Sequence, residues 1–530
     1  MKRKICVAMA AIMLLTTACG SGEVSGEDSV KQDEIVSEVP TEGAAEDVDE
    51  VVDLTVHGMF GEDVQDYSRI VLQEIQKQAG VTLTNTVANS ATDESQSWTL
   101  MMSSPDTLPD IVTHSQLSTI EKFGMDGGLI PLQDLIAEHA PNIQKQFELH
   151  PELKVASTAA DGNMYQVASM KAWTIANVPI IRQDWLDKLG LEIPTNINEL
   201  HDVLYAFRNE DPNGNGEKDE VPIISRLSNT SGVNALLSLF GSTLGLIPRN
   251  GEIFYDPVTP EFKEAVSELS KWYEEGLMDK EIFTRGPDSR NLFLSENKGG
   301  FTMDWTASTT QYNDILKESV PGFNMAVIPP VENLRGDQIA YHKTIPYAGP
   351  AITVGSDKPV EAIKFIDFMY SPEGIMLDAF GIEGVTYEYD EEGKLKFTEL
   401  ITNNPDGTTQ GRIDNGMMAR LGCVDPVELE YVIATNDAAI EGYDLYSENA
   451  DTWYVDDEYI GYQFKYTTEE QQEIALLIAD LEAYVTETTI SWILGNGSVE
   501  SDYDNFINEI KLRGVDRVLE IAQTAYDRVK

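Results

Sequence analysis

Residues 51–87 read VVDLTVHGMFGEDVQDYSRIVLQEIQKQAGVTLTNTV, in which two apolar runs flank one helical repeat. The first run, Val51–Val56, predicts a strand that leads into a glycine-containing loop. Residues 66–79 carry apolar side chains at the spacing of one helix face, and Gly80 ends that helix. The second run, 81–87, predicts another strand. A strand, a helix and a strand in succession indicate an α/β fold.

The same alternation continues along the chain, with no repeat at the period of a solenoid. Further strands are expected at 108–112, 180–181, 301–305 and 325–330. Further helices are expected at 132–139, 184–189, 262–276 and 359–370, and from 467 onward the chain is mostly helical, ending in 507–530. Strands that alternate with helices predict parallel sheets.

The composition of the chain excludes several classes of protein. It has 530 residues, 42% of them apolar, and a net charge of −53. At roughly 150 residues per domain, this length predicts three to four domain-sized units. A chain this acidic repels phosphate backbones and anionic lipid headgroups, so no nucleic acid partner is expected. The three cysteines form no Cys-x-x-Cys pair, which argues against cysteine-rich zinc sites and redox motifs.

The first residues set the expected compartment. A basic start, the apolar run 5–15 and Ala18-Cys19 predict a signal peptide over 1–18. The run is too short for the roughly 20 residues of a membrane span. Its end resembles the bacterial lipobox, although Thr16 stands where that motif prefers Leu. The resemblance implies lipidation of Cys19 by diacyl and palmitate chains, with simple secretion as the alternative.

Residues 19–53 are acidic and almost free of aromatic side chains, which predicts a flexible tether. We therefore expect a globular body on the outer face of the cell membrane, in contact with the membrane through its lipid anchor only.

Residues 211–220 read Asp-Pro-Asn-Gly-Asn-Gly-Glu-Lys-Asp-Glu and place oxygen side chains at the spacing of an EF-hand loop. Pro222 departs from that pattern, because it stands where a bidentate Glu is usual. The alternative is an acidic turn that holds no ion. The sequence predicts one structural calcium ion, bound by the side chains of Asp211, Asn213, Asn215, Asp219 and Glu220 and by the backbone of Glu217.

Several segments in order resemble one family. They are 108–111, 128–132, 140–143, 182–191, 211–222, 272–277 and 525–528. Together they resemble the extracellular solute-binding lipoproteins of carbohydrate ABC importers, near the branch that binds alginate oligosaccharides. The resemblance implies an α/β, two-lobed fold of the periplasmic-binding-protein type, with hinge crossovers and a ligand cleft between the lobes. It also implies a calcium ion on the 211–220 loop.

The expected lobes follow from that resemblance. Lobe 1 is predicted to comprise 54–168 and 347–410, and lobe 2 to comprise 169–346 and 411–530. The expected partners are an oligosaccharide and the transmembrane subunits of an ABC permease, and the expected state is a monomer.

Sugar sites combine aromatic faces with polar groups. Trp305 and Asp304 end a predicted strand, and residues 291–305 resemble maltose-binding proteins, whose matching tryptophan stacks on sugar. Each aromatic candidate could instead be a core residue, as we expect for Trp185 and Trp272. The further candidate contacts are Trp173 and Tyr347 near the crossovers, His57 and Met59 after the first strand, and Trp453 in the last segment.

Three functions stay open at this point. The histidine spacing fits no zinc enzyme, and neither a nucleophile elbow nor a phosphate loop occurs. An oligosaccharide-binding protein that is not an enzyme is preferred; the alternatives are a binding protein for peptides or another solute, and a surface glycosidase. The net charge favours a neutral sugar unless Arg182, Arg412 or Arg420 builds a basic pocket.

Overall fold

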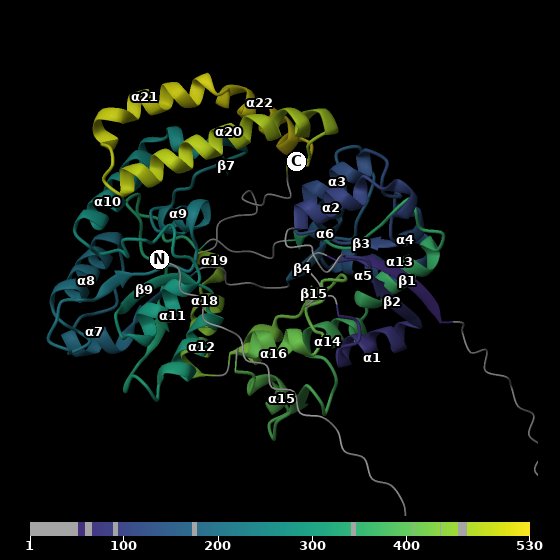
Figure 1. Cartoon of the computed structure of the whole chain (residues 1–530), viewed down its shortest axis with the longest axis horizontal. Coiled ribbons are helices and arrows are strands. Elements are labelled where there is room, and N and C mark those ends of the chain that lie inside the picture. Colours follow the sequence, from purple (N-terminus) through teal and green to yellow (C-terminus); the bar gives the residue numbers. More distant parts are fainter. Residues whose placement is uncertain are drawn as a thin grey trace, which may run out of the picture. The chain divides into compact units, whose positions relative to one another are not determined.

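The computed structural model describes residues 51–58, 66–87, 94–171, 178–340, 346–405, 407–434, 436–453 and 464–529 (Figure 1). All of them belong to one unit, Glu50–Lys530. The signal peptide, Cys19, residues 20–50 of the predicted tether, Met59 and Trp173 lie outside the described residues, whereas the last predicted tether residues, 51–53, lead into the first strand.

The first sheet has the strand order β12-β3-β1-β2. Its strands are β1 (Val52–His57), β2 (Val81–Asn85), β3 (Ile111–Val112) and β12 (Ala351–Ile352). Strand β1 runs parallel to β2 and β3, whereas β12 is antiparallel to β3. The predicted helix between β1 and β2 is α1 (Ile70–Ala79), and Gly80 ends it at φ +68°. It begins later than predicted, because the Asp66 carboxylate accepts the backbone N–H of Ser68 and forms a turn first.

A core of apolar side chains covers this sheet. The helices around it are α2 (Glu94–Met102), α3 (Leu117–Met125), α4 (Gln133–His139), α5 (Pro141–Leu149), α6 (Pro151–Ser157), α13 (Pro359–Met369) and α14 (Pro372–Phe380). Residues 411–429, which the sequence analysis assigned to the other lobe, contribute Met417, Leu421 and Leu429 to this first core. The change to a different core falls between Ile433 and Ala434.

The second sheet has the strand order β10-β5-β9-β6. Its strands are β5 (Val178–Arg182), β6 (Val221–Ile223), β9 (Gly299–Asp304) and β10 (Met325–Val327). Only β6 and β9 are parallel, so the prediction of purely parallel sheets is wrong here. The alternation of strands and helices does not fix strand direction, because a connection with two helices can deliver the next strand either way.

The second core lies beside this sheet and beneath the helices drawn in yellow in Figure 1. Its helices are α7 (Gln183–Leu189), α8 (Ile197–Asn209), α9 (Asn229–Ser238), α10 (Pro260–Glu274), α20 (Thr468–Ile493), α21 (Val499–Leu512) and α22 (Val515–Asp527). Trp185 and Trp272 are each 1% exposed, which confirms them as core residues. The predicted final helix is two helices, because Gly514 adopts a left-handed conformation, with φ +88°, that breaks the helix.

The remaining elements are short. They are η1 (Pro105–Thr107), β7 (Leu246–Arg249), β8 (Glu252–Tyr255), η2 (Asp256–Val258), α11 (Asp288–Ser295), α12 (Ala307–Leu316), β13 (Tyr387–Tyr389), β14 (Leu395–Phe397), α15 (Glu399–Thr402), α16 (Thr408–Asp414), α17 (Glu428–Ile433), α18 (Asp437–Glu448) and α19 (Ala450–Trp453). Among the described helices, none is both long enough and apolar enough to cross a membrane.

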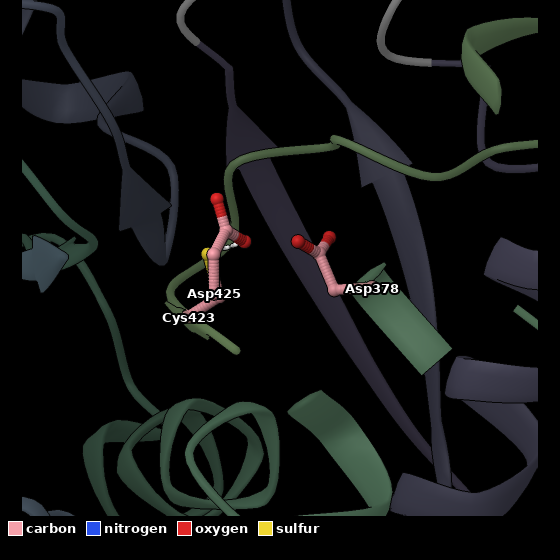
Figure 2. A group of neighbouring side chains, drawn as sticks. All are labelled: Asp378, Cys423 and Asp425. Carbon is pink, nitrogen blue, oxygen red and sulfur yellow. Dashed lines mark hydrogen bonds between the residues drawn. The ribbon is translucent and has the colours of Figure 1, made fainter. Parts of the chain in front are cut away.

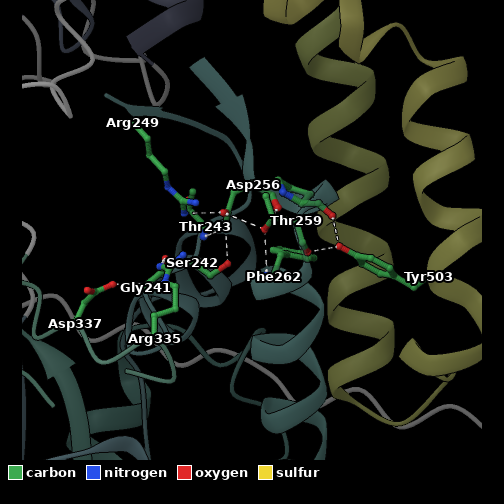
Figure 3. A network of polar contacts seen from close by, with 11 residues as sticks. Gly241, Ser242, Thr243, Arg249, Asp256, Thr259, Phe262, Arg335, Asp337 and Tyr503 are labelled. Atoms are coloured by element: carbon green, nitrogen blue, oxygen red, sulfur yellow. Dashed lines mark hydrogen bonds and ion pairs between the residues drawn. The ribbon is translucent and has the colours of Figure 1, made fainter. Parts of the chain in front are cut away.

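A polar network fastens the C-terminal helices to α10 (Figure 3). Asp256, which is fully buried, accepts hydrogen bonds from Ser242 and from the N–H of Thr243, and pairs with Arg249. The Tyr503 hydroxyl on α21 donates to the carbonyl of Thr259, the N-cap of α10. Each buried polar group named here therefore has a partner within the network.

Three distant segments of the chain meet in a third sheet, which we call the crossover sheet. It consists of β11 (Pro346–Tyr347), β4 (Ser169–Lys171) and β15 (Val424–Asp425) in that order. A buried ion pair between Lys465 and Glu121 ties the segment before α20 to α3. The chain therefore passes between the two cores several times, which is the expected two-lobed arrangement.

Candidate functional site

A cavity of about 560 Å³ lies between elements of both cores. Three segments line it: the turn after β9 with α12, the α15–α16 region, and α17 with α18. Its lining residues are Trp305, Ala307, Ser308, Asp314, Ile315, Thr402, Asn404, Pro405, Gly407, Thr408, Thr409, Arg412, Met418, Glu430, Ile433 and Tyr443. We call this cavity the cleft.

The apolar part of the cleft comes from the end of β9 and from α12. Trp305 is 38% exposed and Ile315 is 55% exposed, although both are large and apolar. The α15–α16 region adds Asn404 and the hydroxyls of Thr408 and Thr409. Exposed aromatic area together with amide and hydroxyl groups is the composition of a site for a ligand with both apolar and hydrogen-bonding faces.

Asp304 does not line the cleft, contrary to prediction. Its side chain is fully buried behind Trp305, because successive strand residues point to opposite faces. Its carboxylate accepts the N–H of Trp305 at 2.8 Å and the Nε–H of Arg226 at 2.8 Å, and it also pairs with Arg290. Asp304 therefore positions its neighbours and offers no free oxygen to a ligand.

Arg226 and Arg290 were not among the site residues predicted from the sequence. Arg290 also donates to the Ser308 hydroxyl at 3.2 Å, so it contacts the cleft lining. Burial lowers the pKa of Arg290 to about 10, and burial also lowers the pKa of Arg226. No short motif joins these arginines to Asp304. The pairing of Ile223 with Phe301 brings the strands together, and such a register is invisible in a local pattern.

Two further predicted contacts lie outside the cleft lining. His57 is 4% exposed, and its ring nitrogens lie 3.0 Å from the Ser97 hydroxyl and 3.4 Å from the Thr86 hydroxyl. Burial lowers the pKa of His57 to about 4. Trp453 is buried and packs edge-on against the Tyr446 ring, with centroids 5.1 Å apart. The α2 helix covers the end of β1, and a third apolar core encloses Trp453.

Tyr347 belongs to a buried group at the crossover sheet. Its hydroxyl lies 3.3 Å from Cys423 Sγ, which in turn lies 3.4 Å from Asp425 Oδ1. The carboxylates of Asp378 and Asp425 point toward one another beside that sulfur (Figure 2). Burial raises the pKa of the Cys423 thiol, and the charges of Asp425 and Asp378 raise it further. We call this group, with Arg412, the crossover cluster.

The three basic candidates have different surroundings. Arg412 is 4% exposed, lines the cleft and lies near the carboxylates of the crossover cluster. Arg420 lies over the Tyr347 ring at 5.8 Å. Arg182 is buried and forms two hydrogen bonds of 2.7 Å with Asp184, so its role is structural.

The 211–220 loop connects α8 to β6 and turns its oxygens inward. Asp211 has φ +52°, and its carboxylate accepts the N–H groups of Gly214, Asn215 and Gly216 at 2.9 to 3.0 Å. The Asn213 side-chain oxygen accepts the N–H of Asn215. The Asn215 side-chain oxygen accepts the N–H of Glu217 at 2.7 Å.

Glu220 closes this loop. It is 1% exposed, and among the described residues neither of its carboxylate oxygens has a hydrogen-bond partner. Burial raises the pKa of Glu220, and the charges of Asp219 and Asp211 raise it further, although the N–H groups of Glu220 and Asn213 lie close enough to offset part of the rise. A buried carboxylate without a partner is costly. The loop therefore fits a cation that prefers oxygen ligands, such as calcium.

Two cores joined by crossovers, with a cleft lined from both sides, define a solute-binding protein. The chain belongs to the family of bacterial extracellular solute-binding proteins, whose profile matches residues 61–376. This confirms the family that the ordered motifs resemble.

Relatives cover nearly the whole body. The fructooligosaccharide ABC transporter substrate-binding protein FusA of Streptococcus pneumoniae serotype 4 is 28% identical over 494 residues, 87% of each chain. A solved FusA EF-hand mutant in complex with fructo-nystose aligns with a TM-score of 0.67 and 24% identity, over 90% of this chain and 99% of that one.

Two further relatives match different shares of the chain. The crystal structure of the alginate-binding protein AlgQ2 without calcium ion aligns with a TM-score of 0.78 and 32% identity, over 90% of this chain and 98% of that one. Lipoprotein LipO of Bacillus subtilis strain 168 is 30% identical over 237 residues, which are 42% of this chain and 46% of LipO.

Proposed function

We propose that this protein captures an oligosaccharide in the cleft and delivers it to the transmembrane subunits of an ABC importer. The observation that carries the proposal is the exposure of Trp305, at 38%, in a cavity that also presents amide and hydroxyl groups. An aromatic face packs on the apolar side of a sugar ring, and polar groups bind its hydroxyls. FusA, a substrate-binding protein for fructooligosaccharides, supports the same class of ligand.

Capture requires closure of the two lobes and no bond breaking. The crossover sheet is the natural hinge, because β11, β4 and β15 come from the three passages of the chain between the cores. We infer that lobe 1 follows the first core, over 54–168 and 347–433, and that lobe 2 follows the second, over 169–346 and 434–530. We infer a monomer that is not an enzyme.

We propose that the 211–220 loop holds one structural calcium ion. The side chains of Asp211, Asn213, Asn215, Asp219 and Glu220 and the backbone of Glu217 would hold it. The ion would balance the buried Glu220 carboxylate, directly before β6. The EF-hand mutant of FusA is in keeping with such a site in a relative.

We propose that Cys19 is the lipidated first residue of the mature protein, which the lipoprotein LipO supports. The Cys19→Ser variant is expected to leave the membrane fraction and appear in the medium. Retention of this variant in membranes would contradict the anchor.

A binding screen tests the main proposal. The purified protein is titrated calorimetrically with neutral and anionic oligosaccharides and with peptides, and the recovered sugar is analysed for cleavage. We expect at least one oligosaccharide to bind and to be recovered intact. Binding of peptides alone, or hydrolysis of the sugar, would contradict the proposal.

A further inference from the structure

Two guanidinium groups share one carboxylate beside the cleft. Asp304 is fully buried and pairs with both Arg226 and Arg290. Among the ion pairs of the described residues, no other carboxylate has two arginine partners. Because one negative charge cannot balance two positive charges, the cluster keeps one excess positive charge.

This local excess of positive charge contrasts with the acidic character of the rest of the chain. The net charge is −53, with 90 acidic and 37 basic residues. The buried carboxylates of Asp256 and Asp279, by comparison, each pair with a single arginine, Arg249 and Arg285 respectively. Charges of the same sign at close range raise the free energy of the folded state, and here each guanidinium disfavours the charge of the other.

The cluster directly adjoins the cleft lining. Asp304 accepts the N–H of Trp305 at 2.8 Å, and Arg290 donates to the Ser308 hydroxyl at 3.2 Å. Both Trp305 and Ser308 line the cleft. The side chain of Arg226 is 25% exposed, and within the described part of the chain only its Nε has a hydrogen-bond partner. Its terminal nitrogens therefore keep donors for a further acceptor.

Arg226 and Arg290 do not themselves line the cleft, but they lie directly behind its Trp305 and Ser308. We propose that Arg226, supported by Arg290 and Asp304, is an anion subsite beside the cleft, and that the captured oligosaccharide carries an anionic substituent. The inference rests on the proposed function and adds that the oligosaccharide is negatively charged. The two common anionic substituents of sugars, a carboxylate and a sulfate ester, share the oxygen geometry that a guanidinium fork binds with two parallel hydrogen bonds. Asp304 holds that fork in place by its Nε–H.

The test uses matched sugars. Tetrasaccharides of glucose, galactose and mannose are each prepared in a neutral, a carboxylated and a sulfated form, and are titrated against the full chain by calorimetry. The variant is Arg226→Gln, which leaves Asp304 paired with Arg290. The matched control is Arg249→Gln, because Arg249 also pairs with a buried aspartate, Asp256, whose hydrogen-bond partners Ser242 and Thr243 do not line the cleft.

We expect one anionic form to bind at least about tenfold more tightly than its neutral counterpart, with a preference that weakens as salt is added. Arg226→Gln should remove this preference and Arg249→Gln should keep it, with both variants folded by circular dichroism. Whichever of the carboxylated and sulfated forms binds identifies the substituent.

Two results would overturn the inference without touching the proposed function. One is equal affinity for neutral and anionic forms, and the other is a preference that survives in Arg226→Gln. If Arg226→Gln does not fold, Arg226→Lys replaces it, and an unchanged tenfold preference together with unchanged salt dependence would overturn the inference. If none of these sugars binds, the neutral and anionic forms of the oligosaccharide found in the wider screen are compared in the same way. Binding of no oligosaccharide in that screen contradicts the proposed function itself, and the inference falls with it.

Discussion

The short strand β6 separates two regions with charge imbalances of opposite sign. Before it, Glu220 ends a loop and buries a carboxylate that has no hydrogen-bond partner among the described residues. After it, Arg226 belongs to a cluster in which guanidiniums outnumber the carboxylate of Asp304. A buried charge without a counter-charge is costly in either case. The sign of each imbalance therefore indicates the sign of the partner that the region is built to receive.

The crossover cluster offers a comparison with these two regions, because positive and negative side chains lie close together in it. Asp378, Cys423 and Asp425 bring ligating atoms within 4.8 Å of one another, which would suit a metal ion by distance alone. However, the positive charges of Arg412 and Arg420 act on the Asp378 carboxylate. These two guanidinium groups offset part of the negative charge of the cluster, so it carries positive charge of its own. Both regions contain clustered acidic residues. They differ because the crossover cluster has guanidinium groups beside its carboxylates, whereas, within the described segments, Glu220 in the 211–220 loop does not.

Removal of the internal counter-charge should have the largest effect. Arg412→Met would remove a buried positive charge that acts on both Asp378, which is buried, and Asp425, which is partly buried. Removal of one partner from a buried charge pair costs about 3–5 kcal/mol. Because Arg412 acts on these carboxylates without a direct ion pair among the described residues, we expect a loss of about 3 kcal/mol in the free energy of unfolding, measured by urea denaturation at pH 7.

The matched control is the double variant Asp378→Asn with Arg412→Met, which removes one charge of each sign. It should be more stable than Arg412→Met alone, because fewer unbalanced charges remain buried. If the single variant loses less than about 1 kcal/mol, the crossover cluster is not balanced by Arg412.

Removal of calcium should have the next largest effect. An ion that binds only the folded state stabilises it by about 2.7 kcal/mol when its free concentration is about 100-fold above Kd. Chelation should therefore lower the Tm, measured by scanning calorimetry. In the same assay Asp378→Asn should keep the full response to calcium, because the positive charges near Asp378 are the guanidinium groups of Arg412 and Arg420.

The variant Glu220→Gln sharpens this prediction, because it reverses the sign of the effect. It neutralises a buried carboxylate for which the described segments supply no hydrogen-bond partner. We expect it to raise the Tm of the calcium-free protein and to reduce the Tm gain on adding calcium. A chelator that leaves the wild-type Tm unmoved would mark the loop as an ordinary turn.

Trp305→Ala should separate stacking from charge. Loss of one aromatic face is expected to weaken oligosaccharide binding by on the order of 1–3 kcal/mol, or about ten- to a hundredfold. Neutral and anionic sugars should lose affinity to the same extent. In Arg226→Gln, by contrast, the preference for the anionic sugar should disappear. Titration calorimetry gives the affinities. Trp453→Ala is the control, because its buried ring should affect stability and leave the affinity of the folded protein unchanged. A Trp305→Ala variant that does not fold would mark Trp305 as core.

Local patterns predicted those parts of the molecule that depend on neighbouring residues. Helix periodicity and Gly80 located α1, and the alternating oxygens of residues 211–220 located a loop whose buried carboxylate, Glu220, has no partner within the described part of the chain. The ordered motifs, through their resemblance to a family, predicted the two-lobed fold.

The remainder depended on long-range pairing. Asp304 and Trp305 were both expected in the cleft, yet adjacent strand residues face opposite sides. The Arg226–Asp304 pair requires the register between β6 and β9, which places Ile223 beside Phe301. His57 ends a strand, as a ligand contact would, but α2 covers that end and Ser97 contacts its ring. The positions of Asp304, Arg226 and His57 therefore depend on tertiary packing, which a short stretch of sequence does not show.

The smallest expected effect is a pH dependence at the crossover cluster. Burial, with a further contribution from the charge of Asp425, raises the pKa of Asp378 to about 6 from 3.8. The folded state therefore holds this proton more tightly than the unfolded state, and ionisation of Asp378 costs stability as the pH rises from about 4 to about 7. Between pH 5 and 7 the cost grows by about 1 kcal/mol.

Urea denaturation of the wild type and of Asp378→Asn at pH 5, 6 and 7, with saturating calcium, isolates this contribution. The other titrating groups are common to both proteins and cancel in the difference. The stability of the wild type relative to the variant should fall by about 1 kcal/mol over this range, because Asn cannot ionise. Parallel stability curves would mean that Arg412 and Arg420 fully compensate Asp378, which would make the crossover cluster more strictly balanced than its burial implies.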